Sequence, residues 1–135
     1  MTVYETVLKW ILRLDGCLLM LAAFAVVLPQ QWMASAHQAL GMGSFPQSPV
    51  MEYLARSVSA LYAMRGALML LASSDLRRHT QLVAFLGISG CIFGVVMLLV
   101  DLEAGMPIWW TLVEGPPVLT TNLLVLALLW KIRQG

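Results

Sequence analysis

The sequence predicts an all-α integral membrane protein, an up-and-down bundle of four transmembrane helices with both termini in the cytoplasm. Hydrophobic residues make up 60% of the 135 residues and charged residues only 11%, whereas about 25% of the residues in an average soluble domain are charged. Four apolar runs each approach or exceed about 20 residues, the length of a helix that crosses the hydrocarbon core. Lys and Arg gather in alternate connections, which is typical of helices that cross a bilayer up and down. We expect a single domain, residues 1–135.

The first predicted helix covers residues 7–28 and ends before Pro29. Lys9 and Arg13 precede the apolar run as in a secretory signal, but Asp15 interrupts the boundary, so we expect the segment to be retained. The following segment up to the second helix contains no Lys, Arg, Asp or Glu and several Gly and Pro residues. We expect a long extracytoplasmic loop that follows the membrane surface, with a short amphipathic helix over residues 32–40.

The second predicted helix, residues 50–73, carries Arg56 and Arg65 inside its apolar run. A polar turn with Arg77 and Arg78 connects it to the third helix, residues 80–100. Gly90 and Gly94 of the third helix form a GxxxG motif, which lets another helix approach closely. We favour a packing contact inside the same bundle over a dimer interface for this motif.

The fourth predicted helix covers residues 108–130 and follows a short acidic loop that contains Asp101 and Glu103. The segment EGPP at residues 114–117 breaks the apolar run near its start. Proline is tolerated in the first turn of a helix, where amide groups lack partners in any case. We therefore expect an interfacial entry or a kinked first turn over residues 109–115.

The basic residues set the predicted orientation, because short cytoplasmic connections carry an excess of Lys and Arg. Three pairs of bases place both termini and the second connection in the cytoplasm: Lys9 and Arg13, Arg77 and Arg78, Lys131 and Arg133. The tryptophans agree with this orientation, since tryptophan gathers at the two membrane interfaces. Trp10 and Trp130 would lie at the inner interface, and Trp32, Trp109 and Trp110 at the outer one.

The composition also argues against several function classes. A net charge of +1 provides no basic surplus for nucleic acid. The two cysteines, Cys17 and Cys91, show no CxxC spacing, so we expect neither a disulfide framework nor a metal site. We find no catalytic motif in the sequence, and we expect no cofactor and no enzymatic turnover.

Arg56 lies at the same predicted depth as an acid of the fourth helix. With a rise of about 1.5 Å per residue, Arg56 lies about 9 Å below the outer end of its helix, and Glu114 lies at a similar depth. Glu52 is four residues before Arg56, a spacing that supports an ion pair on one helix face. Asp101 ends the third helix on the same side. Arg56 thus has three carboxylates within predicted reach, of which we rank Glu114 first.

Arg65 has a corresponding partner in the first helix, because Asp15 rises to the same depth, about 12 Å from the inner end. Arg56 and Arg65 point to nearly opposite sides of their helix at about 100° per residue. The second helix would then contact the fourth through Arg56 and the first through Arg65, unless Arg65 extends to the inner surface instead. We expect Asn122 to supply a hydrogen bond between helices.

These embedded charges leave three functional hypotheses open. The pairs would fix helix register in a small accessory or interaction protein, since a buried charge is tolerated when it is paired. Alternatively, an embedded ionisable site at Arg56 and Glu114, under a loop with His37, would bind the polar head of a lipid-like or quinone-like molecule. The third hypothesis is proton-coupled transport by a dimer, with Glu114 or Asp15 exchanging the proton. The expected partners are membrane lipid, a membrane protein or second copy, and a hydrophobic small molecule.

Four segments together resemble the DoxX-like group of small four-helix membrane proteins. They are WILRLDGCLLMLAAFAVVLP in the first helix, LGMG in the loop, ARSVSALYAMRGALMLLAS in the second helix and VEGPP in the fourth. The resemblance implies an up-and-down four-helix bundle in a bacterial inner membrane. Members of the group are linked to membrane redox enzymes or to the assembly of partner proteins. Arg56, Glu114 and Asp15 match the group by their position in this layout, whereas the cysteines form no redox motif.

Overall fold

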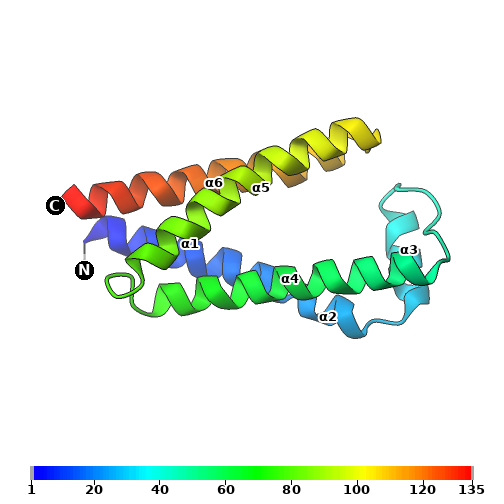
Figure 1. The fold of residues 1–135 in the computed structure, drawn as a ribbon, viewed down its shortest axis with the longest axis horizontal. Coiled ribbons are helices and arrows are strands. Elements are labelled where there is room, and N and C mark those ends of the chain that lie inside the picture. Colours follow the sequence, from blue (N-terminus) through cyan, green and yellow to red (C-terminus); the bar gives the residue numbers. More distant parts are fainter. Residues whose placement is uncertain (1, 135) are drawn as a thin grey trace. The chain divides into compact units, whose positions relative to one another are not determined.

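The computed structural model describes residues 2–134, and this part of the chain is helical without strands. Figure 1 shows the helices in chain order. They are α1 (Val3–Met20), α2 (Ala22–Val27), α3 (Gln30–Ala39), α4 (Pro49–Ser74), α5 (Thr80–Ala104) and α6 (Ile108–Gln134). Four helical segments are long and apolar enough to cross a membrane, with α1 and α2 together forming the first of them. The chain is therefore compatible with an integral membrane protein.

The helices follow the predicted apolar runs and extend beyond most of them. The first begins at Val3 rather than at residue 7, and the fourth continues to Gln134 rather than ending at residue 130. The short helix expected over residues 32–40 is confirmed as α3. The up-and-down topology, the side on which the termini lie and the extracytoplasmic position of the loop stay predictions.

Two compact units share the four long segments. The first unit comprises Met1–Arg13 and Leu71–Gly135, and the second comprises Leu14–Leu70. The first unit thus holds the start of α1, the end of α4 and all of α5 and α6. The second holds the end of α1, α2, α3 and most of α4. The expectation of a single domain stays a prediction.

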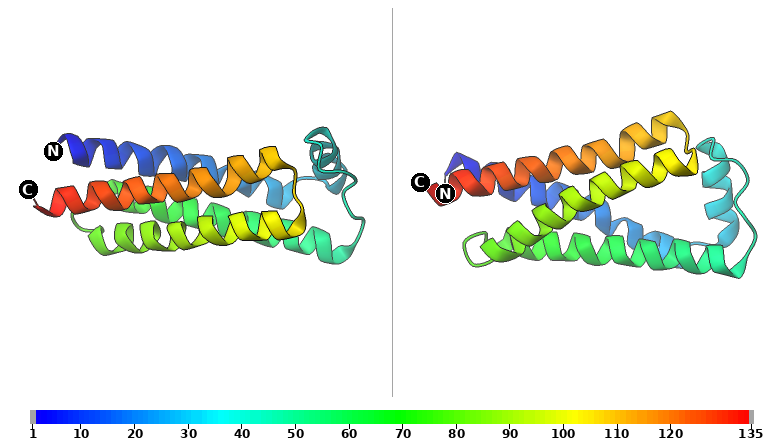
Figure 2. Two further views of the ribbon diagram at one scale, coloured as in Figure 1. Left: turned by 90° about the horizontal axis from the view of Figure 1, so that it is seen from above. Right: turned by 45° about the horizontal axis from the view of Figure 1, so that its top comes forward.

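In the first unit, α5 and α6 run antiparallel and side by side (Figure 2). Small residues make this close approach possible. A methyl group at Gly94 of α5 would lie 2.8 Å from the amide nitrogen of Leu119 and 3.1 Å from the carbonyl oxygen of Gly115 on α6. At Gly90 the same space is filled by the side chain of Asn122. The GxxxG motif therefore packs against a helix of the same chain, as favoured from the sequence.

The connection between α5 and α6 differs from the expected acidic loop. Asp101 and Glu103 belong to the last turn of α5, which ends at Ala104. Gly105 follows with a φ of 66°, and the amide of Met106 donates to the carbonyl oxygen of Asp101 at 3.0 Å. A left-handed glycine at this position closes a helix by binding its last free carbonyl groups. The helix thus continues through the acidic residues to the glycine.

The predicted break near the start of the fourth helix is wrong. The helix α6 continues from Ile108 to Gln134, with Pro116 and Pro117 inside it. The hydroxyl of Thr120 donates to the carbonyl oxygens of both prolines, at 3.0 and 3.1 Å. These are bonds to carbonyl groups three and four residues earlier. The prolines themselves remove the amide donors that would bind the carbonyl groups of Leu112 and Val113, and membrane helices accommodate such prolines by local adjustment of the backbone.

In the second unit, one residue separates α1 from α2. Leu21 keeps right-handed helical backbone angles, and its amide lies near the carbonyl oxygens of Cys17 and Leu18, at 3.3 and 3.2 Å. Beyond Pro29, α3 lies across the direction of α4 (Figure 2). A loop then returns the chain to the start of α4 through Gly41, whose φ of 73° suits glycine.

Candidate functional site

Arg56 on α4 closes the end of α2 in the second unit. Its Nη1 donates to the carbonyl oxygen of Val26 at 2.9 Å, and its Nη2 donates to that of Leu28 at 3.4 Å. The last carbonyl groups of a helix have no amide partner in the helix itself, and Pro29 has no amide hydrogen to offer. The guanidinium supplies hydrogen bonds there and places a positive charge at the negative end of the helix dipole.

The same guanidinium forms an ion pair within its own helix. Nη2 of Arg56 lies 2.7 Å from Oε1 of Glu52, with 37% and 35% of the two side chains exposed. The predicted spacing of four residues thus produces the pair expected from it. Within residues 2–134, the buried Nε atom of Arg56 has no hydrogen-bond partner.

The other acids expected near Arg56 belong to the first unit. Glu114 accepts a 2.6 Å hydrogen bond at Oε2 from the indole nitrogen of Trp110 on the same helix. Asp101 is buried at 3% exposure, and its Oδ2 has no hydrogen-bond partner among residues 2–134. Whether either acid pairs with Arg56 stays a prediction.

Asp15 and Arg65 interact electrostatically in the second unit. Next to each of them in sequence is a glycine at which α1 and α4 touch. A methyl group at Gly66 would lie 2.6 Å from the carbonyl oxygen of Gly16, which leaves no room for any side chain. This close contact between two backbones brings the acid and the base on neighbouring positions to the same level of the helix pair.

Asn122 lies buried in the seam between α5 and α6. Its Nδ2 donates to the carbonyl oxygen of Val118 at 2.7 Å, on its own helix. Its side chain also fills the space beside Gly90. Asn122 therefore contacts the neighbouring helix by packing, and the expected hydrogen bond between helices stays a prediction.

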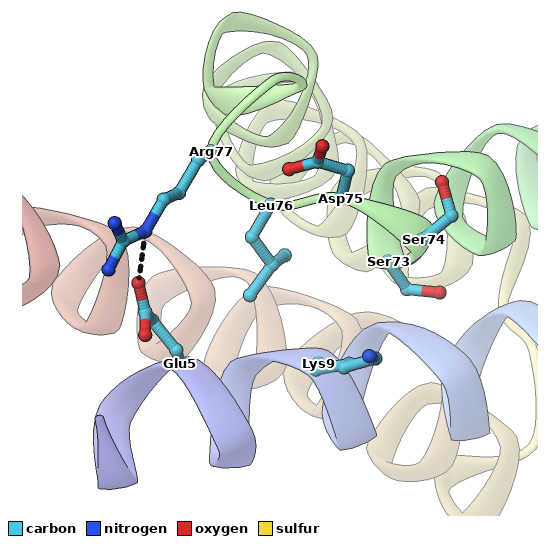
Figure 3. Close-up of a pocket in the computed structure, with 7 residues that line it drawn as sticks. All are labelled: Glu5, Lys9, Ser73, Ser74, Asp75, Leu76 and Arg77. Carbon is cyan, nitrogen blue, oxygen red and sulfur yellow. Dashed lines mark hydrogen bonds and ion pairs between the residues drawn. The ribbon is translucent and has the colours of Figure 1, made fainter. Parts of the chain in front are cut away.

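Glu5 is a site residue that the sequence analysis missed. Its Oε2 accepts from the amide of Thr2 at 2.8 Å, and its own amide donates to the Thr2 hydroxyl at 3.2 Å. These reciprocal bonds form a capping box at the start of α1. The second oxygen, Oε1, accepts from Nε of Arg77 at 3.0 Å (Figure 3). The signal in the sequence was a Thr followed three residues later by a Glu, just before an apolar run.

Two open pockets adjoin this ion pair in the first unit, and Arg77 lines both of them. The smaller pocket, of about 390 Å³, is shown in Figure 3, where the side chain of Leu76 extends toward α1. It is lined by Glu5, Lys9, Ser73, Ser74, Asp75, Leu76 and Arg77. The larger pocket has a volume of about 590 Å³. It is lined by Thr2, Val3, Tyr4, Glu5, Arg77, Lys131 and Ile132.

The turn between α4 and α5 holds Arg77 in place. Oδ1 of Asp75 accepts from the amide of Arg78 at 3.1 Å, and the carbonyl oxygen of Asp75 accepts from the amide of His79 at 3.0 Å. An Asp that binds the backbone a few residues ahead stabilises a tight turn. Arg77 lies inside this turn, so the turn fixes the backbone from which its side chain reaches Glu5.

The ion pairs at these sites join carboxylate and guanidinium groups. Within residues 2–134, no three His, Cys, Asp or Glu side chains come together to hold a metal ion. No protein-family model, curated protein or solved structure matches the chain. The resemblance to DoxX-like proteins therefore stays a prediction.

Proposed function

We propose that this chain is a four-span integral protein of a bacterial inner membrane, with both termini in the cytoplasm, that acts as an accessory protein by binding another membrane protein. Four segments of sufficient length and apolarity support the membrane part of the proposal. The basic residues at both termini and in the turn before α5 support the orientation, because such residues are retained on the cytoplasmic side.

The observation that supports the accessory role is that Arg56 is bound by groups of its own chain. Both terminal nitrogens of its guanidinium bind acceptors of the same unit, namely Glu52 and the carbonyl groups that end α2. An arginine whose terminal nitrogens already have acceptors stabilises the fold, and these nitrogens are not needed to bind a ligand. The embedded charges then have a structural role, and a partner protein would bind to the outer surface of the helices.

One face of α5 offers such a surface. Its large apolar side chains recur every three or four residues, a spacing that places them on one side of a helix. Phe85, Ile88, Ile92, Val95 and Leu99 are exposed by 64%, 53%, 61%, 44% and 60%. In a membrane this stripe would contact lipid tails or the helix of a partner protein.

Site-specific photocrosslinking in native membranes tests the proposal. A photoreactive amino acid replaces Ile92 on the stripe, and a matched control replaces Leu61, an exposed position of α4. We expect a discrete protein adduct from position 92, recovered again when the identified partner is tagged and captured. Lipid adducts of equal yield at both positions, without a protein adduct, would contradict the accessory role.

A second candidate function is the binding of a lipid-like or quinone-like molecule at Arg56 and Glu114. The observation in its favour is the buried Nε donor of Arg56, which has no hydrogen-bond partner among residues 2–134. A ligand with a carbonyl or phosphate oxygen would satisfy this donor. Mass spectrometry of the purified protein should then detect a bound molecule that Arg56→Ala loses, and identical profiles would exclude this role. Proton-coupled transport stays a prediction, tested by Glu114→Gln in liposomes.

A further inference from the structure

Most of the basic residues of this protein lie in the first unit. They are six of the eight Lys and Arg residues, all except Arg56 and Arg65. The two pockets show how they gather, because each pocket is lined by the start of α1 and the turn before α5, and the larger pocket also by the end of α6. The acids lining these pockets are Glu5 and Asp75. Three of the six basic residues, Lys9, Arg77 and Lys131, line the pockets, so the pocket lining has one more basic residue than acids.

The larger pocket holds two cations with different surroundings. Arg77 donates from its Nε to Oε1 of Glu5. Its side chain is 81% exposed, so its guanidinium can also reach an incoming anion. Lys131 lies over the ring of Trp130, with 5.4 Å between its Nζ and the ring centroid. It forms no salt bridge with a carboxylate of residues 2–134.

Part of the larger pocket is apolar, so its lining matches an amphipathic molecule. Val3, Tyr4 and Ile132 form this part of the wall. Farther along α1, the guanidinium of Arg13 lies 5.7 Å from the ring centroid of Trp10. Tryptophans beside basic residues are typical of the headgroup level of a membrane, where one part of the side chain meets lipid and the other meets water.

We propose that the larger pocket, between Arg77 and Lys131, binds the phosphate of an anionic phospholipid headgroup. The inference rests on the membrane insertion proposed above. Arg77 provides paired donors suited to phosphate oxygens, Lys131 provides a second positive charge, and the apolar wall contacts the first carbons of the acyl chain. Basic pockets between helices on the cytoplasmic side of a membrane bind anionic headgroups in this way.

Glu5 is the positioning residue of this site. Its carboxylate is buried and already fixed by Thr2, so it presents a rigid acceptor to Arg77. The side chain of Arg77 is itself 81% exposed. Without this anchor the guanidinium would sample many orientations in water. The ion pair thus orders the donors before the lipid arrives, which reduces the entropy lost on binding.

Native mass spectrometry of the detergent-solubilised full chain tests the inference. The probes are phosphatidylglycerol and phosphatidylcholine with identical acyl chains, together with inorganic phosphate as a competitor. Lys131→Gln removes a pocket charge and leaves the Glu5–Arg77 pair intact. Arg133→Gln is the matched control, because Arg133 is exposed on the same helix end but does not line either pocket. The double variant Glu5→Gln/Arg77→Gln removes the pair without leaving a buried charge unpaired.

We expect phosphatidylglycerol to bind more tightly than phosphatidylcholine, and inorganic phosphate not to displace it. Lys131→Gln should weaken phosphatidylglycerol binding about fivefold, the effect of one basic residue near a headgroup. The double variant should weaken it at least as much, and Arg133→Gln by less than about twofold. Equal losses in Lys131→Gln and Arg133→Gln would overturn the site in favour of diffuse attraction. Displacement by phosphate would overturn it in favour of a free anion.

Alkaline carbonate extraction of native membranes separates this inference from the proposed function. If carbonate releases the wild-type chain, the chain is not integral, and both proposals fail. If the chain stays in the membrane but binds the two lipids equally, only the headgroup site fails.

Discussion

The Nε atom of Arg77 donates to Oε1 of Glu5 at 3.0 Å across 72 positions of sequence, and the other oxygen of this carboxylate caps α1. One buried acid therefore joins the start of the first span to the connection before the third. Both residues belong to the same compact unit. The pair places a guanidinium between two pockets that open at the end of this unit.

Replacing either member of this pair should lower the thermal stability of the protein in detergent. In Arg77→Gln the buried Glu5 carboxylate loses its charged partner, and in Glu5→Gln the capping box also loses its charge. Because the residues share one interaction, the loss in the double variant should be smaller than the sum of the single losses. Thermal denaturation curves of the two single variants and the double variant measure these losses. Strictly additive losses of stability would show that Glu5 and Arg77 do not interact. The control is Arg78→Gln, which removes a positive charge from the same turn.

Gly66→Ala should destabilise the crossing of α1 and α4. The added methyl group would lie 2.6 Å from the carbonyl oxygen of Gly16, and a backbone atom cannot rotate away. Overpacking of this kind costs about 1 to 3 kcal/mol. The control is Ala67→Val, which adds volume at the next, exposed position. Denaturant titration in mixed micelles should separate the two variants, and equal stabilities would show that the helices are not in contact at Gly66.

Gly94→Ala should destabilise the seam of α5 and α6 for the same reason. The new methyl group would approach the amide nitrogen of Leu119 at 2.8 Å. We expect a loss of about 1 to 3 kcal/mol, against little change in Val96→Leu, which alters an exposed position of α5. A stabilised Gly94→Ala protein, with the helix propensity of alanine dominating, would contradict the close approach.

Arg56→Lys should destabilise the second unit more than Glu52→Gln. Lysine is a point charge and does not reproduce the fork of donors that binds two carbonyl groups and a carboxylate together. Hydrogen bonds from a charged donor contribute about 1.5 to 3 kcal/mol, whereas a partly exposed ion pair four residues apart contributes about 0.5 kcal/mol. Chemical denaturation of both variants provides the comparison. A larger effect in Glu52→Gln would mean that the ion pair, not the capping of α2, is the role of Arg56.

The sequence was sufficient to predict the long helices, because an apolar run of about 20 residues leaves the backbone few alternatives. The positions of Gly90 and Gly94 likewise predicted a close helix contact, since their spacing is visible within one helix. The ends of the helices were less predictable. At Asp101 and at Pro116 the polar residue or the proline lies inside the helix, because backbone hydrogen bonding outweighs the local preference.

The contacts of the candidate site were harder to predict than the fold. Comparing predicted depths in the membrane can pair only side chains with side chains. Arg56 instead binds the backbone carbonyl groups of Val26 and Leu28, which no sequence pattern indicates. The contact of Gly16 with Gly66 joins two helices, so neither glycine shows a motif within its own helix. Glu5 was visible as part of a capping box, but its partner Arg77 is remote in sequence.

We propose that both termini and the basic turn before α5 lie on the cytoplasmic side of the membrane. Cysteine accessibility tests this orientation most directly. In a variant lacking Cys17 and Cys91, single cysteines replace Ser44 in the loop before α4 and Arg78 in the turn before α5. A membrane-impermeant thiol reagent is applied to intact cells and to opened membranes. We predict that position 44 reacts in intact cells and that position 78 reacts only after the membrane is opened. Labelling of position 44 from the cytoplasmic side alone would contradict the account.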